Sequence, residues 1–186
     1  MDAHRWLRWR HRRRPVSAAA RMIASWDATV RLPVRAHLLW LAQQITEART
    51  TAQAALDGPA AAQERLPQVL DLDLAPQLVA DHMPSGARQL AEAVREARRA
   101  VRQLTTAPRS ARRTLTRLVD DLERAEVLFA RACNDVRGAD LASADLTHLY
   151  LGGLRWDSAT QWPAGWWDRV RAGSEPVDGG QQIRDY

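Results

Sequence analysis

Residues 134–158 read NDVRG, ADLAS, ADLTH, LYLGG and LRWDS when they are written in fives, and this stretch decides how we interpret the chain. The central position of every unit is apolar, and it holds Val136, Leu141, Leu146, Leu151 and Trp156. Neither a helix, with about 3.6 residues per turn, nor a strand, with a period of about two, produces a period of five. A short fixed repeat instead predicts a solenoid, in which each unit buries its apolar residue by stacking on its neighbours.

The units that begin Ala139-Asp140-Leu141 and Ala144-Asp145-Leu146 resemble the A-D-L-x-x units of the pentapeptide-repeat family. The resemblance implies a β-helix in which each unit forms one side of a square coil, with the central residue and the small residue two before it facing inward. Four units would complete a coil, so this segment would hold barely more than one. Some longer family members mimic DNA and bind topoisomerases, but this segment is too short for that role. The resemblance therefore implies local shape and no function.

The chain before the repeat carries helical patterns. We expect Ser17 to cap a first helix, and Asp57-Gly58-Pro59 to end a second one that begins near Pro33. After the second helix, prolines and the stretch 70–74, in which leucine and aspartate alternate as LDLDL, interrupt any long helix. Only two short helical pieces are therefore expected in that part of the chain. The expected helical ranges are 17–31, 33–57, two pieces within 60–83, 85–105 and 111–132.

In the three long helices the apolar residues alternate at steps of four and three. This spacing is typical of helices packed in a left-handed bundle, and the short turn at 107–110 predicts that the last two helices are antiparallel. The residues expected to carry the packing are Leu90, Val94, Val101, Leu115, Leu118, Leu122 and Phe129. The predicted fold class is mainly α: an antiparallel helical bundle followed by a short pentapeptide-repeat, β-helix-like coil and a Trp-rich cap.

The predicted cap follows from four closely spaced tryptophans, Trp156, Trp162, Trp166 and Trp167. Because a solenoid exposes an open apolar end, we expect them to be buried over that end, with an aromatic ligand site as the alternative. The string W-D-x-x-T-x-W-P-x-x-W that they form resembles a tail in uncharacterised proteins of high-GC Gram-positive bacteria, where it also follows degenerate pentapeptide units. The expected divisions are a disordered basic tail (1–16), the bundle (17–133), the repeat (134–158) and the cap (159–186).

The net charge of +5 comes from the N-terminus. Residues 1–14 hold six arginines and one acid, whereas the other 172 residues hold 21 arginines and 21 acids. We weigh a solvated tail, a nucleic-acid contact, binding to a membrane surface and a translated leader ahead of Met22. In the nucleic-acid interpretation, the residues that neutralise phosphates or stack on bases are Arg5, Trp6, Arg8, Trp9, Arg10, Arg12, Arg13 and Arg14.

Other residues that carry chemistry do not form a recognisable catalytic or metal-binding pattern. His37, His82 and His148 are far apart and lack the spacing of metal ligands, and Asp140 and Asp145 match the outward surface positions of the repeat. Neither a catalytic group nor a cofactor is therefore predicted, and we expect no enzyme.

We expect the lone cysteine, Cys133, to be a small buried hydrophobic residue. Because a single cysteine cannot form an internal disulfide, we also expect a reducing compartment. The sequence shows neither a membrane-spanning apolar stretch nor a secretory signal, so we expect a cytoplasmic protein. The leading functional hypothesis is a non-enzymatic interaction or scaffold protein that binds a protein partner or forms a homo-oligomer. The alternative is a nucleic-acid-associated protein that contacts phosphates through its N-terminal tail.

Overall fold

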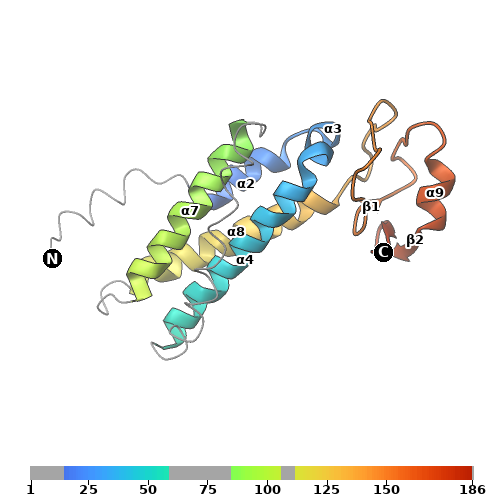
Figure 1. The fold of residues 1–186 in the computed structure, drawn as a ribbon. Helices are drawn as coiled ribbons and strands as arrows, with labels where there is room; N and C mark the ends of the chain where they lie inside the picture. Colours follow the sequence, from blue (N-terminus) through green and yellow to red (C-terminus); the bar gives the residue numbers. More distant parts are fainter. Residues whose placement is uncertain (1–14, 59–84, 106–111, 186) are drawn as a thin grey trace.

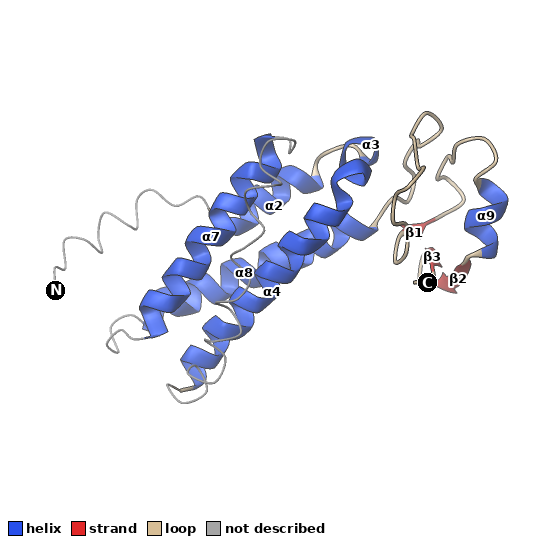
Figure 2. Ribbon diagram, viewed as in Figure 1, coloured by secondary structure: helices blue, strands red, loops and turns tan. Residues whose placement is uncertain are grey.

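The computed structural model describes residues 15–58, 85–105 and 112–185. The basic tail and the two short pieces predicted within 60–83 lie outside the described residues. The described chain is mainly helical and ends in a small antiparallel sheet (Figure 2). The helical elements are α2 (Val16–Ala24), α3 (Ala28–Arg31), the 3₁₀ turn η1 (Leu32–Val34), α4 (Arg35–Asp57), α7 (Ser85–Thr105), α8 (Arg112–Asn134) and α9 (Trp167–Ala172); the strands are β1 (Arg155–Trp156), β2 (Ser174–Val177) and β3 (Gly180–Ile183).

Helices α2, α4, α7 and α8 form the bundle (Figure 1). Each of α2 and α4 packs against both α7 and α8, whereas α7 and α8 make few contacts with each other. Helices α7 and α8 run in opposite directions, as predicted (Figure 1). Six of the seven residues expected to carry the packing are buried. The seventh, Leu118, is half-buried, and the neighbouring Val119 is buried instead.

The prediction of a single helix over 17–31 is wrong, because helix α2 ends at Ala24 and a separate helix, α3, begins at Ala28. The carboxylate of Asp27 accepts hydrogen bonds from the backbone N–H and the hydroxyl of Thr29, both at 3.0 Å, and so starts the new helix α3. Such local side-chain bonds compete with helix continuation. Val30, predicted to lie on the apolar stripe, is 47% exposed as a result.

Asp121 of α8, and not Ser17, caps the start of α2. Its carboxylate accepts a 2.7 Å hydrogen bond from the backbone N–H of Val16, a longer one from the N–H of Ser17, and a short one from the Ser17 hydroxyl. The first N–H groups of a helix have no partner within it, and a carboxylate there also favours the helix dipole. One side chain therefore fixes the position of α2 on α8.

Residues 135–185, which we call the C-terminal module, follow α8. From 136 to 154 a backbone hydrogen bond recurs every five residues: the amide of the first residue of a unit donates to the carbonyl of the central residue of the unit before, at Ala139–Val136, Ala144–Leu141, Leu149–Leu146 and Leu154–Leu151. The chain then returns beside itself in parallel bridges between Asp135 and Arg155 and between Asp140 and Gln161, which are 20 and 21 residues apart (155 − 135 and 161 − 140).

The burial pattern of the repeat agrees with the five-residue spacing. Leu141 and Leu146 are buried, while Asp140, Asp145 and Thr147 are exposed, as predicted; Leu151 is half-buried. The aspartates also shape the turns. Asp140 and Asp145 each accept a hydrogen bond from the backbone N–H two residues later, as do Asp135 and Asp157. This Asx-turn role explains why an acid precedes the central residue in the first three units, whereas Asp157 follows the central Trp156 of the last one.

The module ends in a β-hairpin that was not predicted from the sequence. Strands β2 and β3 are joined by Asp178-Gly179, a two-residue turn in which Gly179 has φ of +76°. Strand β3 also pairs with β1, and a Cβ at Gly180 would lie 2.3 Å from the carbonyl oxygen of Trp156. Only glycine allows this approach.

The prediction that all four tryptophans of the cap are buried holds for two of them. Trp156 is buried, with its indole N–H donating to the Ser174 hydroxyl at 2.9 Å, and it meets Trp162 and Trp167 edge to face. Trp162 is also buried, Trp166 is half-buried and Trp167 is 42% exposed. The prediction is therefore wrong for Trp167 and holds only in part for Trp166.

Replacing Asp121 with alanine should lower the free energy of unfolding by about 1–2 kcal/mol, because two N–H groups at the start of α2 lose their acceptor. Asp120→Ala is the matched control, since Asp120 is the exposed neighbour of Asp121 on the same helix. Urea denaturation of both variants measures the difference. Equal stability of the two would contradict the capping role.

Candidate functional site

The C-terminal end of α8 is held by two arginines that lie one helical turn apart. The guanidinium of Arg31 donates to the carbonyl oxygens of Ala132 and Asp135, and its Nε donates to the carbonyl of Trp26 at 3.0 Å. The last carbonyls of a helix have no partner within it and carry partial negative charge. A guanidinium therefore satisfies both the hydrogen bonding and the electrostatics of this helix end.

Arg35 extends the same contact into the C-terminal module. Its side chain is buried, and its Nε donates to the carbonyl of Cys133 at 2.7 Å. The two terminal nitrogens donate to the carbonyls of Tyr150 and Gly152, both at 2.7 Å, and to the Asn134 side-chain oxygen at 2.8 Å. Four of the five guanidinium N–H groups are therefore used, and one side chain joins α4, α8 and the repeat.

Burial changes the acid–base behaviour of this region. Desolvation lowers the pKa of Arg31 and of Arg35, although a guanidinium remains charged in proteins. Desolvation raises the pKa of Cys133 to about 12. The thiol is therefore neutral near pH 7, and this buried residue is a packing element and not a nucleophile.

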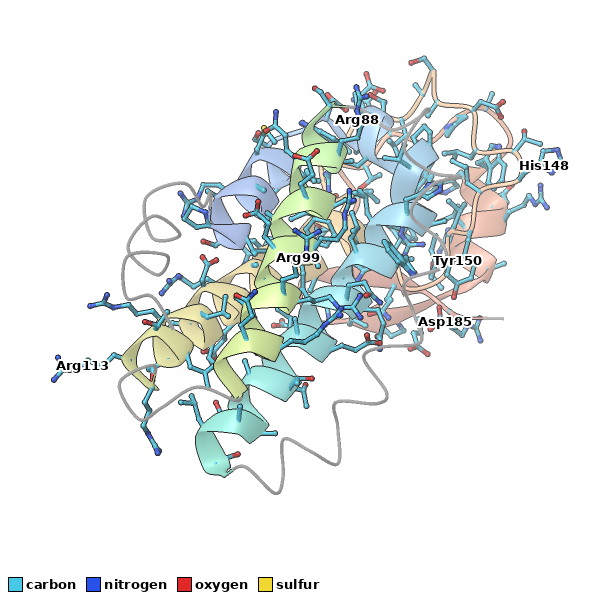
Figure 3. All side chains as sticks on the ribbon, turned by 60° about the vertical axis from the view of Figure 1, so that its left-hand side comes forward. Arg88, Arg99, Arg113, His148, Tyr150 and Asp185 are labelled. Atoms are coloured by element: carbon cyan, nitrogen blue, oxygen red, sulfur yellow. The ribbon has the colours of Figure 1, made fainter. Side chains whose placement is uncertain are left out.

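An open cleft of about 720 Å³ lies where the module meets the bundle. Figure 3 shows Tyr150 and Asp185 near each other at this junction, beside α4. The cleft is lined by Arg35, Leu39, Val127, Ala130, Arg131, Asn134, Asp135, Arg137, Tyr150, Gly152, Gly153, Arg155, Gln182 and Asp185. Its lining contains four arginines and two aspartates, which leaves a net charge of +2 (4 − 2).

Both carboxylates in the cleft already have partners. Asp135 accepts two bonds from the Arg137 guanidinium, at 3.0 and 2.7 Å, and these hydrogen bonds lower the pKa of Asp135. Asp185 accepts a 2.6 Å hydrogen bond from the Tyr150 hydroxyl, and this bond raises the pKa of Tyr150. Neither acid is positioned as an unengaged general base.

Two cationic side chains of the cleft make no direct ion pair with a described acid, although the charge of Arg131 helps to lower the pKa of Asp135. Arg131 is exposed and makes no hydrogen bond or ion pair there, and Arg155 makes only a long 3.4 Å bond to the Gln182 side chain. Beside them, Val127 and Tyr150 are 63% and 53% exposed. Cationic and apolar groups are therefore both presented to solvent in one cleft.

The remaining sequence-predicted residues lie elsewhere. The eight candidate nucleic-acid contacts of the tail fall outside the described residues, as does His82. His37 is half-buried on α4, and His148 is exposed on the repeat. Over residues 15–58, 85–105 and 112–185, no three His, Cys, Asp or Glu side chains gather in a way that could hold a metal ion.

Sequence reasoning missed Arg31 and Arg35. Each is one of 27 basic residues, all of them arginine, and none of the motifs marks these two. The available signal is that Arg31, Arg35 and Leu38 recur at steps of four and three, which places both arginines on the inner face of the chain.

Neither a protein-family model nor a curated protein nor a solved structure matches this chain. No described helix combines the length and the apolar character that spanning a bilayer requires. Function is therefore argued from the geometry of the cleft.

Arg35→Lys should lower the free energy of unfolding by about 1–3 kcal/mol, because an ammonium cannot reach four acceptors in a planar fork and buried carbonyls lose their donors. Amide hydrogen exchange should show the loss of protection concentrated in residues 135–185. Arg131→Lys, on the exposed side of the same cleft, is the control and should change little. Similar behaviour of the two variants would show that Arg35 does not hold the module.

Proposed function

We propose that this chain is a non-enzymatic interaction protein whose cleft binds an acidic segment of a partner protein. The observation that carries the proposal is the pair of exposed arginines, Arg131 and Arg155, which face the cleft without an ion pair in the described structure. A carboxylate accepts two parallel hydrogen bonds from a guanidinium, so an acidic segment matches this lining.

The neighbouring apolar groups supply the second half of the argument. Tyr150 presents a large exposed ring, and Val127 exposes most of its side chain beside Arg131. Buried aromatic anchors supply much of the affinity at protein interfaces, whereas charges at the rim steer association and set specificity. The cleft offers both kinds of group on elements whose positions are fixed by Arg35.

A binding role fits the cleft better than a catalytic one. Its two carboxylates are engaged by Arg137 and Tyr150, and the thiol of Cys133 is buried and neutral. General acid–base chemistry needs a group that can reach a substrate proton, and nucleophilic chemistry needs an activated nucleophile. The lining side chains do not supply either arrangement.

The test is a binding titration of the full chain with a fluorescent glutamate-rich peptide. The double variant Arg131→Glu, Arg155→Glu should weaken binding by at least about tenfold, because opposite charges become like charges. Arg124→Glu is the matched control, since Arg124 is an exposed arginine of α8 outside the cleft. An equal loss in both variants, or an unchanged affinity in the double variant, would refute the cleft as the binding surface.

Nucleic-acid association through residues 1–14 is the alternative function. It is supported by the sequence, which places the whole net charge of +5 in this tail and interleaves two tryptophans with the arginines. Duplex DNA therefore belongs in the same titration as a second probe. DNA binding that falls steeply with salt and disappears when residues 2–14 are deleted would favour this alternative over the cleft.

We also propose that residues 134–158 are a pentapeptide-type β-helical coil of little more than one turn. The recurring turn bonds, the parallel bridges after 20 and 21 residues and the burial of the central residues Leu141 and Leu146 support this proposal. In such a coil the central residue fills a packed interior, and the residues that follow it face solvent.

Leu146→Ala should therefore lower the free energy of unfolding by about 2–5 kcal/mol, because the lost transfer free energy and the cavity add. Ser143→Ala, at an exposed position of the preceding unit, should have an effect below about 0.5 kcal/mol. Thermal and urea unfolding of both variants measure these changes. A small effect of Leu146→Ala would argue against a packed coil interior.

A further inference from the structure

A second open groove, of about 410 Å³, shares part of its wall with the cleft. Tyr150 and Gly152 line both recesses. Two consecutive residues are divided between them, since Asp185 lines the cleft and Arg184 lines the groove. The remaining groove residues come from the repeat, α9 and the end of β3. The two recesses therefore adjoin each other at Tyr150.

The groove combines partly exposed apolar side chains with two arginines. Leu149, Leu151 and Trp166 line it and are half-buried, so each keeps some surface for a ligand. The Arg169 guanidinium lies 5.0 Å from the centre of the Trp166 ring, and Arg184 donates at 2.8 Å to the last carbonyl of α9. Neither arginine makes an ion pair with a described acid, and the residues that line the groove include no aspartate or glutamate.

Tyr150, at the boundary of the two recesses, is held by contacts on several sides. Its hydroxyl donates to Asp185 at 2.6 Å, and the Arg35 guanidinium lies 5.4 Å from the centre of its ring (Figure 3). A Cβ at Gly152 would lie 2.6 Å from the Tyr150 hydroxyl oxygen and 2.5 Å from the Asp185 carboxylate, so a side chain there would displace this pair. The ring is nevertheless 53% exposed. A held, exposed aromatic ring loses little freedom on binding and is suited to anchor a ligand.

Together the two recesses carry a strong positive charge. Six arginines and two aspartates line them, which leaves a net charge of +4 (6 − 2). An arginine lies against the ring of Tyr150 and another against that of Trp166, which leaves fewer aromatic faces on which nucleic-acid bases could stack. Acidic and aliphatic side chains of a protein match this lining better, because the groove also presents leucines.

We propose that one acidic segment of a partner protein occupies both recesses and crosses Tyr150 between them. This inference rests on the proposed function of the cleft and specifies its ligand: an extended stretch with acidic residues at both ends and an apolar residue between them. One acidic end pairs with Arg131 and Arg155, and the other pairs with Arg169 and Arg184. The apolar residue packs on the Tyr150 ring and on the leucines of the groove. Because the two ends are linked, binding of one raises the effective concentration of the other.

The test compares fluorescent peptides in titrations of the full chain. Two-ended peptides carry a pair of glutamates at each end and a leucine in the middle of a spacer of three, five or seven residues, which covers about 10–23 Å when extended. One-ended peptides are identical except that glutamine replaces glutamate at one end. The best two-ended peptide should bind at least about tenfold more tightly than its one-ended counterpart, because both recesses are then engaged.

A charge reversal in the groove assigns the second end of the peptide. Arg169→Glu should lower the affinity of the best two-ended peptide to that of its one-ended counterpart, whose own affinity should change by less than about twofold. Arg171→Glu is the matched control, because Arg171 is also exposed on α9 but does not line the groove. Circular dichroism of each variant monitors folding.

The outcomes separate this inference from the proposed function. Equal affinity of two-ended and one-ended peptides at every spacer length would overturn the inference, as would equal effects of Arg169→Glu and Arg171→Glu. If the double variant Arg131→Glu, Arg155→Glu still weakens peptide binding, the cleft remains the binding surface and only its extension into the groove is refuted.

Two further results reach beyond the groove. If the wild-type chain binds none of the peptides, the proposed function of the cleft fails together with this inference. Single-stranded DNA that binds more tightly than every peptide and is released by Arg169→Glu would assign the two recesses to nucleic acid and overturn the inference.

Discussion

The C-terminal end of α8 is the constraint on which the rest of the structure depends. The helix ends at Asn134 without a glycine that could close it, since the next one is Gly138. Its last carbonyls therefore need donors from other elements. Arg31 and Arg35 supply them, and Arg35 also bonds to the carbonyls of Tyr150 and Gly152. The same contacts that satisfy the helix end fix the position of the module on the bundle, and the cleft follows from that position.

The module depends on the bundle for its hydrophobic core as well. The apolar residues of the five-residue units form one hydrophobic cluster with residues from other elements. Ala28 and Leu32 cover it from the bundle side, and Trp162, Val170 and Ile183 cover it from α9 and the hairpin region. Small units bury too little apolar area to offset their conformational entropy alone. The bundle and the module therefore share a hydrophobic cluster, although their sequence patterns differ completely.

The sequence predicted those parts of the fold that repeat and missed those that depend on one side chain. The alternating apolar positions located α4, α7 and α8, and the five-residue spacing gave the burial of Leu141 and Leu146. The break before α3 and the cap at α2 depend on Asp27 and Asp121, whose bonds compete with patterns that span many residues. The hairpin was readable, because Asp178-Gly179 is a strong turn signal between two short strands. The cleft was not, since it joins residues more than a hundred positions apart.

The arrangement of charge explains why composition gave so little information about the site. Outside residues 1–14 the chain is neutral, with 21 arginines and 21 acids, yet the charges are not mixed evenly. Asp121 is used at a helix start, Glu126 pairs with Arg49, and the aspartates of the repeat shape turns. Acids engaged in this way leave arginines such as Arg131, Arg155 and Arg169 without an ion pair in the described structure. The same residue type is buried at Arg35, where a planar group with five donors is required and lysine would not serve. Local use of acids, and not net charge, therefore creates the cationic surfaces of this protein.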